Sequence, residues 1–146
     1  MTRYLAWRPH QSLRDALAAM LSRLACWEAG TEFSWVITQH ENPSIMGMIT
    51  AIPDRQPWRC SLGYVLGHEH WNHGFMTEAV SAVVQAAFNQ QGIYRVWAVV
   101  DEENHASARV LEKVGMQREG ILRRWALHPN ISSLPRDCWC FATTKE

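Results

Sequence analysis

The fold of this chain is decided by the stretch Gly63-Tyr64-Val65-Leu66-Gly67-His68-Glu69-His70-Trp71-Asn72-His73-Gly74-Phe75-Met76-Thr77-Glu78-Ala79. Residues 62–66 form a short apolar run bordered by glycine, which is typical of a buried strand. From residue 76 onward, apolar side chains recur with the spacing of one helical face, at positions 76, 79, 80, 83, 84, 87 and 88. The stretch therefore predicts a strand, a polar turn and a helix in direct succession.

The start of this helix has no capping side chain. Gly74 stands directly before Phe75, where Ser, Asp or Asn would usually cap a helix. The first turn is therefore expected to leave backbone N–H groups bare, at the positive end of the helix dipole. A strand that leads into such a helix start is a good seat for a phosphate group. The residues alone leave open an ordinary strand–helix turn in which Gly74 serves only close packing.

The composition indicates one domain, which we assign to residues 1–146. The net charge is zero and no Lys/Arg run occurs, so we expect no nucleic-acid partner. No apolar run approaches the roughly 18 residues of a membrane span, and the first residues lack a signal-peptide core. Four cysteines without a C-x-x-C pair predict reduced thiols in a cytoplasmic protein. One His-x-His pair is weak support for a metal site, and we predict none.

The rest of the chain predicts alternating elements around this stretch. Apolar spacing and turn residues favour helices over 13–28, from 76 to Gly92, and from Asn104 to Gly115. They favour strands over 33–39, 45–52, 94–100, 116–127 and 138–144, with turns or loops at 41–44, 53–59 and 128–135, and an irregular start at 1–10. Hairpins at both ends and two helical crossovers between them predict a mixed α/β sheet with helices on its faces.

Four motifs in the expected order carry a family resemblance. They are 63–66 with Trp71–Ala79, 93–96, Asn104–Met116, and 119–123 followed by Asp137. Together they resemble the GNAT N-acetyltransferases, most closely the RimJ/RimL-like branch that acetylates the N-termini of ribosomal proteins. The resemblance implies a mixed, mostly antiparallel sheet with helices on both faces and central strands that splay apart.

The resemblance also implies that acetyl-CoA lies between the splayed strands. The cofactor-binding residues that it implies are Tyr64, Val65, Leu66, Trp71, Asn72, His73, Gly74, Phe75, Met76, Thr77, Asn104, Ser107 and Lys113. By the same analogy, the catalytic residues are Ser107, which hydrogen-bonds the departing thiolate, and Asn104, which positions the pantetheine or a water. The residues alone leave open that both are ordinary helix-start residues, with Asn104 as the cap.

The chain departs from the family pattern at three places. Met76 stands where Gly or Ala is usual, which makes the phosphate seat more crowded. His73 stands where a basic residue is frequent, which weakens contact with the 3′-phosphate of the cofactor. The family's first strand and helix are absent, so we expect either a trimmed start or a second chain that covers the front of the sheet. A homodimer is the expected assembly.

The implied reaction is direct acetyl transfer to a primary amine in a ternary complex. The acceptor is a protein N-terminal α-amine or a small-molecule amine, and an inactive acyl-CoA-binding module is the alternative. Glu69, His70, Glu103 and His128 are the candidate bases, and none stands out. An α-amine pays about 1.4 kcal/mol to be neutral at pH 7, whereas a lysine pays about 4.6 kcal/mol, so a weak base favours the α-amine. We expect the acceptor pocket beside the first helix and the 128–135 loop, lined by some of Trp7, Trp27, Trp35, Trp58 and Trp125.

Overall fold

The computed structural model describes residues 3–146, so the first two residues of the segment predicted to be irregular lie outside it. Within that range the chain forms three α-helices, one short 3-10 helix and a six-stranded sheet. The elements are α1 (Leu13–Glu28), β1 (Phe33–Gln39), β2 (Asn42–Pro53), β3 (Arg59–Leu66), η1 (His68–His70), α2 (Phe75–Asn89), β4 (Arg95–Asp101), α3 (His105–Lys113), β5 (Gln117–Ala126) and β6 (Arg136–Thr144).

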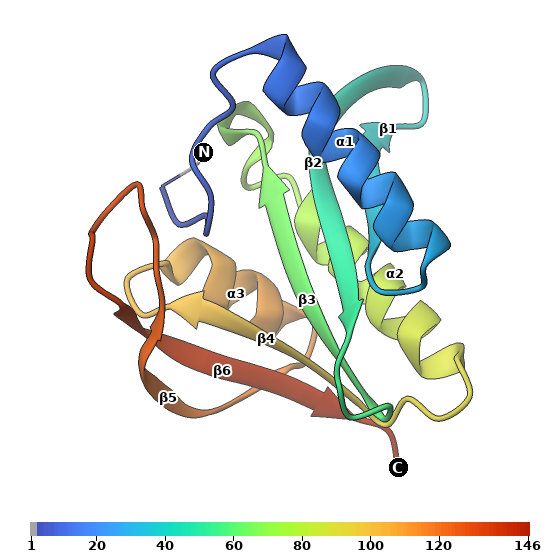
Figure 1. Cartoon of the computed structure of the whole chain (residues 1–146). Helices are drawn as coiled ribbons and strands as arrows, with labels where there is room; N and C mark the ends of the chain where they lie inside the picture. The colour runs from blue at the N-terminus through green and yellow to red at the C-terminus, as the bar shows by residue number, and fades with distance from the viewer. Residues whose placement is uncertain (1–2) are drawn as a thin grey trace.

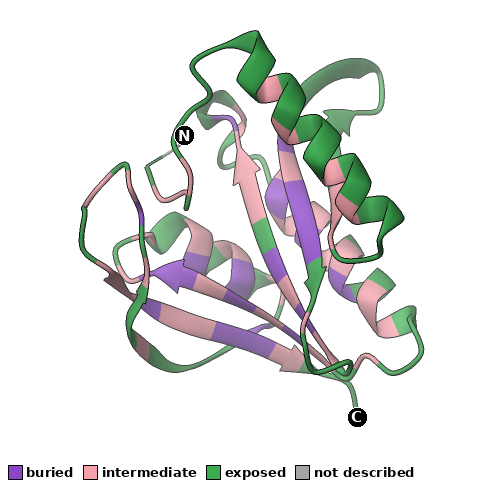
Figure 2. Cartoon of the chain, in the orientation of Figure 1, coloured by how far each residue is buried: buried purple, intermediate pink, exposed green. Residues whose placement is uncertain are grey.

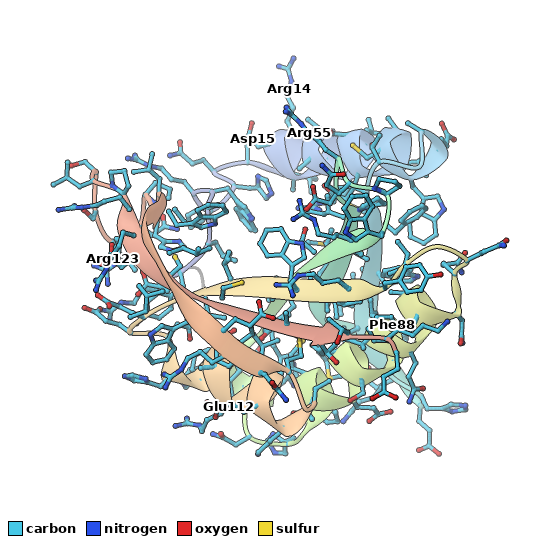
Figure 3. All side chains as sticks on the ribbon, turned by 90° about the horizontal axis from the view of Figure 1, so that it is seen from below. Arg14, Asp15, Arg55, Phe88, Glu112 and Arg123 are labelled. Atoms are coloured by element: carbon cyan, nitrogen blue, oxygen red, sulfur yellow. The ribbon has the colours of Figure 1, made fainter. Side chains whose placement is uncertain are left out.

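The strand order in the sheet is β1-β2-β3-β4-β6-β5. Only β3 and β4 run parallel; the other four neighbouring pairs are antiparallel. Seen edge-on in Figure 3, α1 lies on one side of the sheet and α2 and α3 on the other, and Arg14 of α1 points away from the body. The predicted mixed, mostly antiparallel sheet with helices on both faces is confirmed.

The two central strands part soon after they pair. β3 and β4 are joined at three positions, the last of which is Ser61 opposite Trp97. Beyond that point β3 stays paired with β2 as far as Leu66, and β4 stays paired with β6 as far as Asp101. Figure 1 shows the two halves of the sheet diverging from the end near the C-terminus, with the N-terminal segment across the wide end. We call the space between β3 and β4 beyond Ser61 and Trp97 the wedge.

The core lies between the central strands and the helices α2 and α3. Val80 of α2 and Leu111 of α3 are fully buried, together with Val96 of β4 and Phe141 of β6. These helical positions belong to the apolar faces that the sequence predicts. Figure 2 shows the buried segments concentrated on the middle strands and the inner sides of these two helices. The helices are therefore fixed on the sheet with their first turns beside the wedge.

Helix α1 has a different environment. Its N-cap Ser12 accepts a hydrogen bond from the Asp15 N–H at 3.1 Å, as the capping pattern predicts. None of the residues 13–28 is buried, and α1 is largely exposed in Figure 2. The helix touches β1 through Trp27, whose ring lies 5.2 Å from that of Trp35. Its predicted apolar stripe faces solvent at Leu13, Leu17, Met20, Leu21 and Leu24.

Several predicted boundaries are wrong by a few residues. β2 begins at Asn42, because this residue pairs with Gln39, so the turn comprises residues 40 and 41. β3 begins at Arg59, which ends the predicted loop but pairs with Arg95 of β4, and Cys60 and Ser61 pair with both neighbouring strands. α2 ends at Asn89, three positions before Gly92. The ends of these strands are defined by backbone hydrogen bonds to the neighbouring strand, and a local pattern of apolar residues does not predict those bonds.

The different burial of two helical leucines predicts very different losses of stability when each is replaced by alanine. Leu111→Ala removes a fully buried side chain of α3 and should lower the free energy of unfolding by about 2–5 kcal/mol. Leu17→Ala in α1, where the side chain is 54% exposed, should change it by less than about 0.5 kcal/mol. Urea unfolding monitored by circular dichroism measures both values. Equal losses in the two variants would contradict the packing described for α1 and α3.

Candidate active site

A cavity of about 470 Å³ lies in the wedge. It draws its walls from β3, from the loop and first turn of α2, from α3 and from the N-terminal segment. The described residues that line it are Arg3, Tyr4, Leu5, Tyr64, Val65, Leu66, His70, Trp71, Asn72, Gly74, Phe75, Met76, Thr77, Asn104, Ala106, Ser107, Arg109, Val110 and Lys113. The space is long enough to touch both helix starts at once.

The α2 wall presents an uncapped helix start, as predicted. Gly74 is the N-cap residue, with a φ of +84°, and no side chain caps it within the described part of the chain. The first intrahelical bond runs from the Glu78 N–H to the Gly74 carbonyl, at 3.0 Å. The N–H groups of the three residues before Glu78 are therefore left for another acceptor. Met76 belongs to the core and is only 5% exposed, and it also lines the cavity at this seat.

The β3 wall presents unpaired backbone groups. The Gly67 N–H donates to the Met46 carbonyl at 2.8 Å. This bond shows which residues of β3 direct their backbone N–H and C=O groups toward β2. Because such pairs alternate along an antiparallel ladder, Val65 also turns its backbone groups toward β2, whereas Tyr64 and Leu66 turn theirs toward the wedge. The Leu66 carbonyl is satisfied by the Trp71 indole N–H at 3.0 Å. The groups left open to the cavity are therefore the N–H groups of Tyr64 and Leu66 and the carbonyl of Tyr64.

The α3 wall brings Asn104 and Ser107 together. Asn104 caps α3, because its Oδ1 accepts the Ser107 N–H at 3.3 Å. The Ser107 Oγ lies 2.8 Å from the Tyr64 Oη across the wedge. Asn104 thus has the capping role that the sequence alone suggests, and Asn104 and Ser107 both line the cavity as well.

The cavity carries positive charge. Arg109 and Lys113 lie one turn apart on α3 and both line it, with Arg3 and His70 nearby. Among residues 3–146, neither Arg109 nor Lys113 forms an ion pair, whereas Arg3 lies 3.8 Å from the Glu103 carboxylate. Two unpaired cations facing an uncapped helix start favour an anionic ligand.

A buried carboxylate fixes the turn that presents α3. The Asp101 side chain accepts from the Arg136 Nε at 2.6 Å and from the Glu103 N–H at 3.0 Å. Burial raises the pKa of Asp101, but the Arg136 and Glu103 hydrogen bonds outweigh burial, and the net pKa is lowered. The Asp101 carbonyl also accepts the Asn104 N–H at 2.8 Å. His128 is buried beside this carboxylate, with its Nε2 3.5 Å from Oδ2.

The structure places nearly all the predicted cofactor-binding residues on this cavity. The exception is His73, whose ring stacks on that of Phe75 at 5.7 Å instead of lining the cavity. His70, a candidate base, also lines the cavity, and the lining residues that the sequence does not predict are Arg3, Tyr4, Leu5, Ala106, Arg109 and Val110. Arg109 carries a usable signal, because it stands four residues before Lys113 and so shares its helical face.

The acceptor pocket stays a prediction, and the five tryptophans proposed for it do not line this cavity. Among the described lining residues, the one tryptophan is Trp71, and the five tryptophans expected there lie elsewhere. Trp27 packs on Trp35 under α1, and Trp7 stacks on His10 at 5.2 Å. Arg3, Tyr4 and Leu5 of the N-terminal segment line the cavity instead.

The cysteines do not take part in this site. All four are free, and no cysteine is among the described residues that line the cavity. Burial raises the pKa of the Cys138 thiol to about 11 and also raises those of Cys60 and Cys140. Thiols held protonated in this way are poor nucleophiles.

Within residues 3–146 no group of three or more potential metal ligands occurs, and no helix is long and apolar enough to cross a bilayer.

The comparisons with known proteins agree with this geometry. Residues 1–117 match the model of the acetyltransferase (GNAT) domain. The chain belongs to the GNAT acetyltransferase family. It is 32% identical over 127 residues to the uncharacterized N-acetyltransferase YoaA of Bacillus subtilis, which covers 86% of this chain and 71% of YoaA. Over 68 residues it is 31% identical to the ribosomal protein uS5-alanine N-acetyltransferase of Escherichia coli, covering 47% of this chain and 35% of that enzyme.

The fold is shared with solved structures of GNAT enzymes. The microcin C7 self-immunity acetyltransferase MccE superposes with a TM-score of 0.89 at 17% identity, over 99% of this chain and 78% of MccE. The predicted family and GNAT fold are therefore confirmed. The predicted class of activity, an acetyl-CoA-dependent N-acetyltransferase, is confirmed with them.

Proposed function

We propose that this GNAT protein, acting as one domain over residues 1–146, transfers the acetyl group of acetyl-CoA to a primary amine by direct attack in a ternary complex. The observation that carries the proposal is the cavity in the wedge, which joins an uncapped helix start, open strand groups and Ser107 in one space. MccE, whose fold is the same, was solved in complex with acetyl-CoA and AMP.

The anionic end of the cofactor fits the α2 start. The backbone N–H groups between Asn72 and Thr77 would hold the diphosphate, and Arg109 and Lys113 would balance its charge from α3. The helix dipole stabilises an anion at an exposed helix start by only about 0.3–1 kcal/mol. Cations on the opposite wall would therefore strengthen the binding of the diphosphate. His73 faces Phe75 instead of the cavity and contributes least of the predicted set.

The reactive end fits the narrower part of the wedge. The N–H groups of Tyr64 and Leu66 suit the pantetheine amides and the thioester carbonyl, whose developing negative charge one of them would stabilise. Acetyl-CoA supplies an activated acetyl thioester. The Ser107 hydroxyl then donates a hydrogen bond to the sulfur that leaves with the C–S electron pair, while Asn104 holds α3 in register through its cap.

The acceptor is a primary amine, either a protein N-terminal α-amine or a small-molecule amine. The α-amine is favoured by its lower pKa, because no strong base lines the cavity among residues 3–146: Glu103 is paired with Arg136 at 3.1 Å, and His128 is buried. The relative that acetylates ribosomal protein uS5 acts on an alanine, whose amine is an α-amine. His70, among the four candidate bases, is the one that lines the cavity.

We further propose that the protein works in the cytoplasm, without nucleic acid, as a homodimer. Four free thiols and a net charge of zero support the first two points. The exposed apolar stripe of α1 supports the third, together with β1, whose outer edge is unpaired within residues 3–146.

The first test measures thiol release from acetyl-CoA with a panel of α-amino and ε-amino acceptors, followed by mass spectrometry of the product. We expect turnover to be highest with α-amines at neutral pH. Ser107→Ala should lower kcat about tenfold to a hundredfold and change the Kd for CoA less. Ser22→Ala, at an exposed helical serine of α1, is the matched control and should leave both unchanged. CoA binding without release for any amine would favour an acyl-CoA-binding module instead.

The second test probes the phosphate seat at Gly74. A Cβ at this position would meet no protein atom within 4 Å, so a valine side chain would project into the space assigned to the ligand. Gly74→Val should abolish CoA binding in calorimetry at micromolar CoA. Gly92→Val is the control, because Gly92 also has a positive φ, +92°, and open space, but does not line the cavity. Both variants carry about 1–3 kcal/mol of backbone strain, and wild-type CoA affinity in Gly74→Val would refute the seat.

The third test concerns self-association. Light scattering coupled to size exclusion should give the mass of two chains for the wild type. Met20→Glu with Leu24→Glu places charges on the exposed stripe of α1 and should yield one chain. A wild-type protein that elutes with the mass of a single chain over the micromolar range would rule out the dimer.

A further inference from the structure

The Tyr64 hydroxyl reaches Ser107 from the opposite wall of the wedge. Tyr64 belongs to the part of β3 that no longer pairs with β4, and Ser107 lies in the first turn of α3. The Tyr64 Oη is 2.8 Å from the Ser107 Oγ and 3.2 Å from the Ser107 carbonyl oxygen. Within residues 3–146, these are the side-chain hydrogen bonds that join β3 to α3. A single phenol therefore contacts both polar groups of the residue proposed to face the leaving sulfur.

The protons of this pair allow two arrangements. A carbonyl oxygen only accepts, and each hydroxyl has one proton to donate. In the first arrangement the phenol donates to the Ser107 carbonyl, and the Ser107 hydroxyl donates to the phenol oxygen. In the second arrangement the phenol donates to the Ser107 Oγ, which leaves the Ser107 proton free for a group in the cavity. The two differ only by rotation of the O–H bonds, so no heavy atom has to move.

Burial keeps the Tyr64 phenol protonated at neutral pH, so that it can donate a hydrogen bond. Burial raises the pKa of Tyr64 to about 12, although the hydrogen bond with Ser107 opposes the shift. A protonated phenol that donates to a serine oxygen makes the serine a better donor in turn, because hydrogen bonds in a chain polarise one another. The half-buried position of Tyr64 limits competition from water for these bonds.

We propose that Tyr64 is a positioning residue for acetyl transfer, whose hydroxyl turns from the Ser107 carbonyl to the Ser107 Oγ as negative charge develops on the sulfur. The inference rests on the proposed function, in which Ser107 faces that sulfur. In the reaction the C–N bond forms, the C–S bond breaks and the sulfur keeps the electron pair, while the amine releases its proton to the site or the solvent. Tyr64 and Ser107 exchange hydrogen bonds and lose no proton.

A role in catalysis differs measurably from a role in holding the wedge together. Tyr64→Phe keeps the ring and removes only the hydroxyl. We expect kcat to fall about tenfold, the effect of one hydrogen bond, with the KM for acetyl-CoA changed less than about threefold. The pKa of the CoA thiol in the complex, followed by thiolate absorbance against pH, should rise in Tyr64→Phe and in Ser107→Ala. Tyr94→Phe, at an exposed tyrosine that does not line the cavity, is the control and should match the wild type.

The decisive measurement is a double-mutant cycle of Tyr64→Phe and Ser107→Ala. Because Tyr64 acts through the Ser107 Oγ, the double variant should be no slower than Ser107→Ala alone. Effects that multiply, a wild-type kcat in Tyr64→Phe, or a loss confined to KM and melting temperature would overturn the inference and leave the proposed function intact. A wild-type kcat in Ser107→Ala would remove the proposed role of Ser107, and this inference with it.

Discussion

The separation of β3 from β4 after Ser61 and Trp97 is the constraint on which the site depends. Each strand keeps its other neighbour, so the sheet stays intact while Tyr64 and Leu66 face a gap instead of a ladder. Unpaired backbone groups are costly when buried, and a ligand that bonds them removes that cost. The helices that follow the two strands start on opposite walls of this gap, which explains why residues from 64 to 113 meet in one cavity.

The geometry of the wedge is set at both of its ends. Three β3–β4 pairs close the narrow end, and the buried Asp101–Arg136 pair fixes the turn from β4 into α3 at the wide end. A buried charge pair of this kind contributes little net stability, because desolvation offsets attraction. Its contribution here is positional. The Asp101 carbonyl accepts the Asn104 N–H, and the Asn104 side chain in turn caps α3 by accepting the Ser107 N–H.

Much of this arrangement follows from the sequence. Apolar spacing locates α2, and its uncapped start follows from Gly74, while the motif resemblance supplies the walls of the wedge and Ser107. The contacts that close the site are not predictable in this way, because they join residues far apart in the chain. Tyr64 and Ser107 are 43 residues apart, and the Tyr4 hydroxyl meets the Glu103 carbonyl across 99 residues. No local sequence pattern predicts such pairs, and the motif does not predict the stacking of His73 on Phe75 either.

The two sides of the wedge are held with very different strength. The cofactor side is built on α2 and α3, whose Val80 and Leu111 are fully buried, so its shape is tied to the core. The N-terminal residues that line the cavity are held mostly by exposed contacts, of Tyr4 and Arg3 with Glu103 and of the Trp7 carbonyl with Asn130, although the Tyr4 ring also contacts the buried His128. Exposed pairs of this kind are worth about 0–1 kcal/mol each. The N-terminal wall of the cavity is therefore held less firmly than the wall that α2 and α3 form.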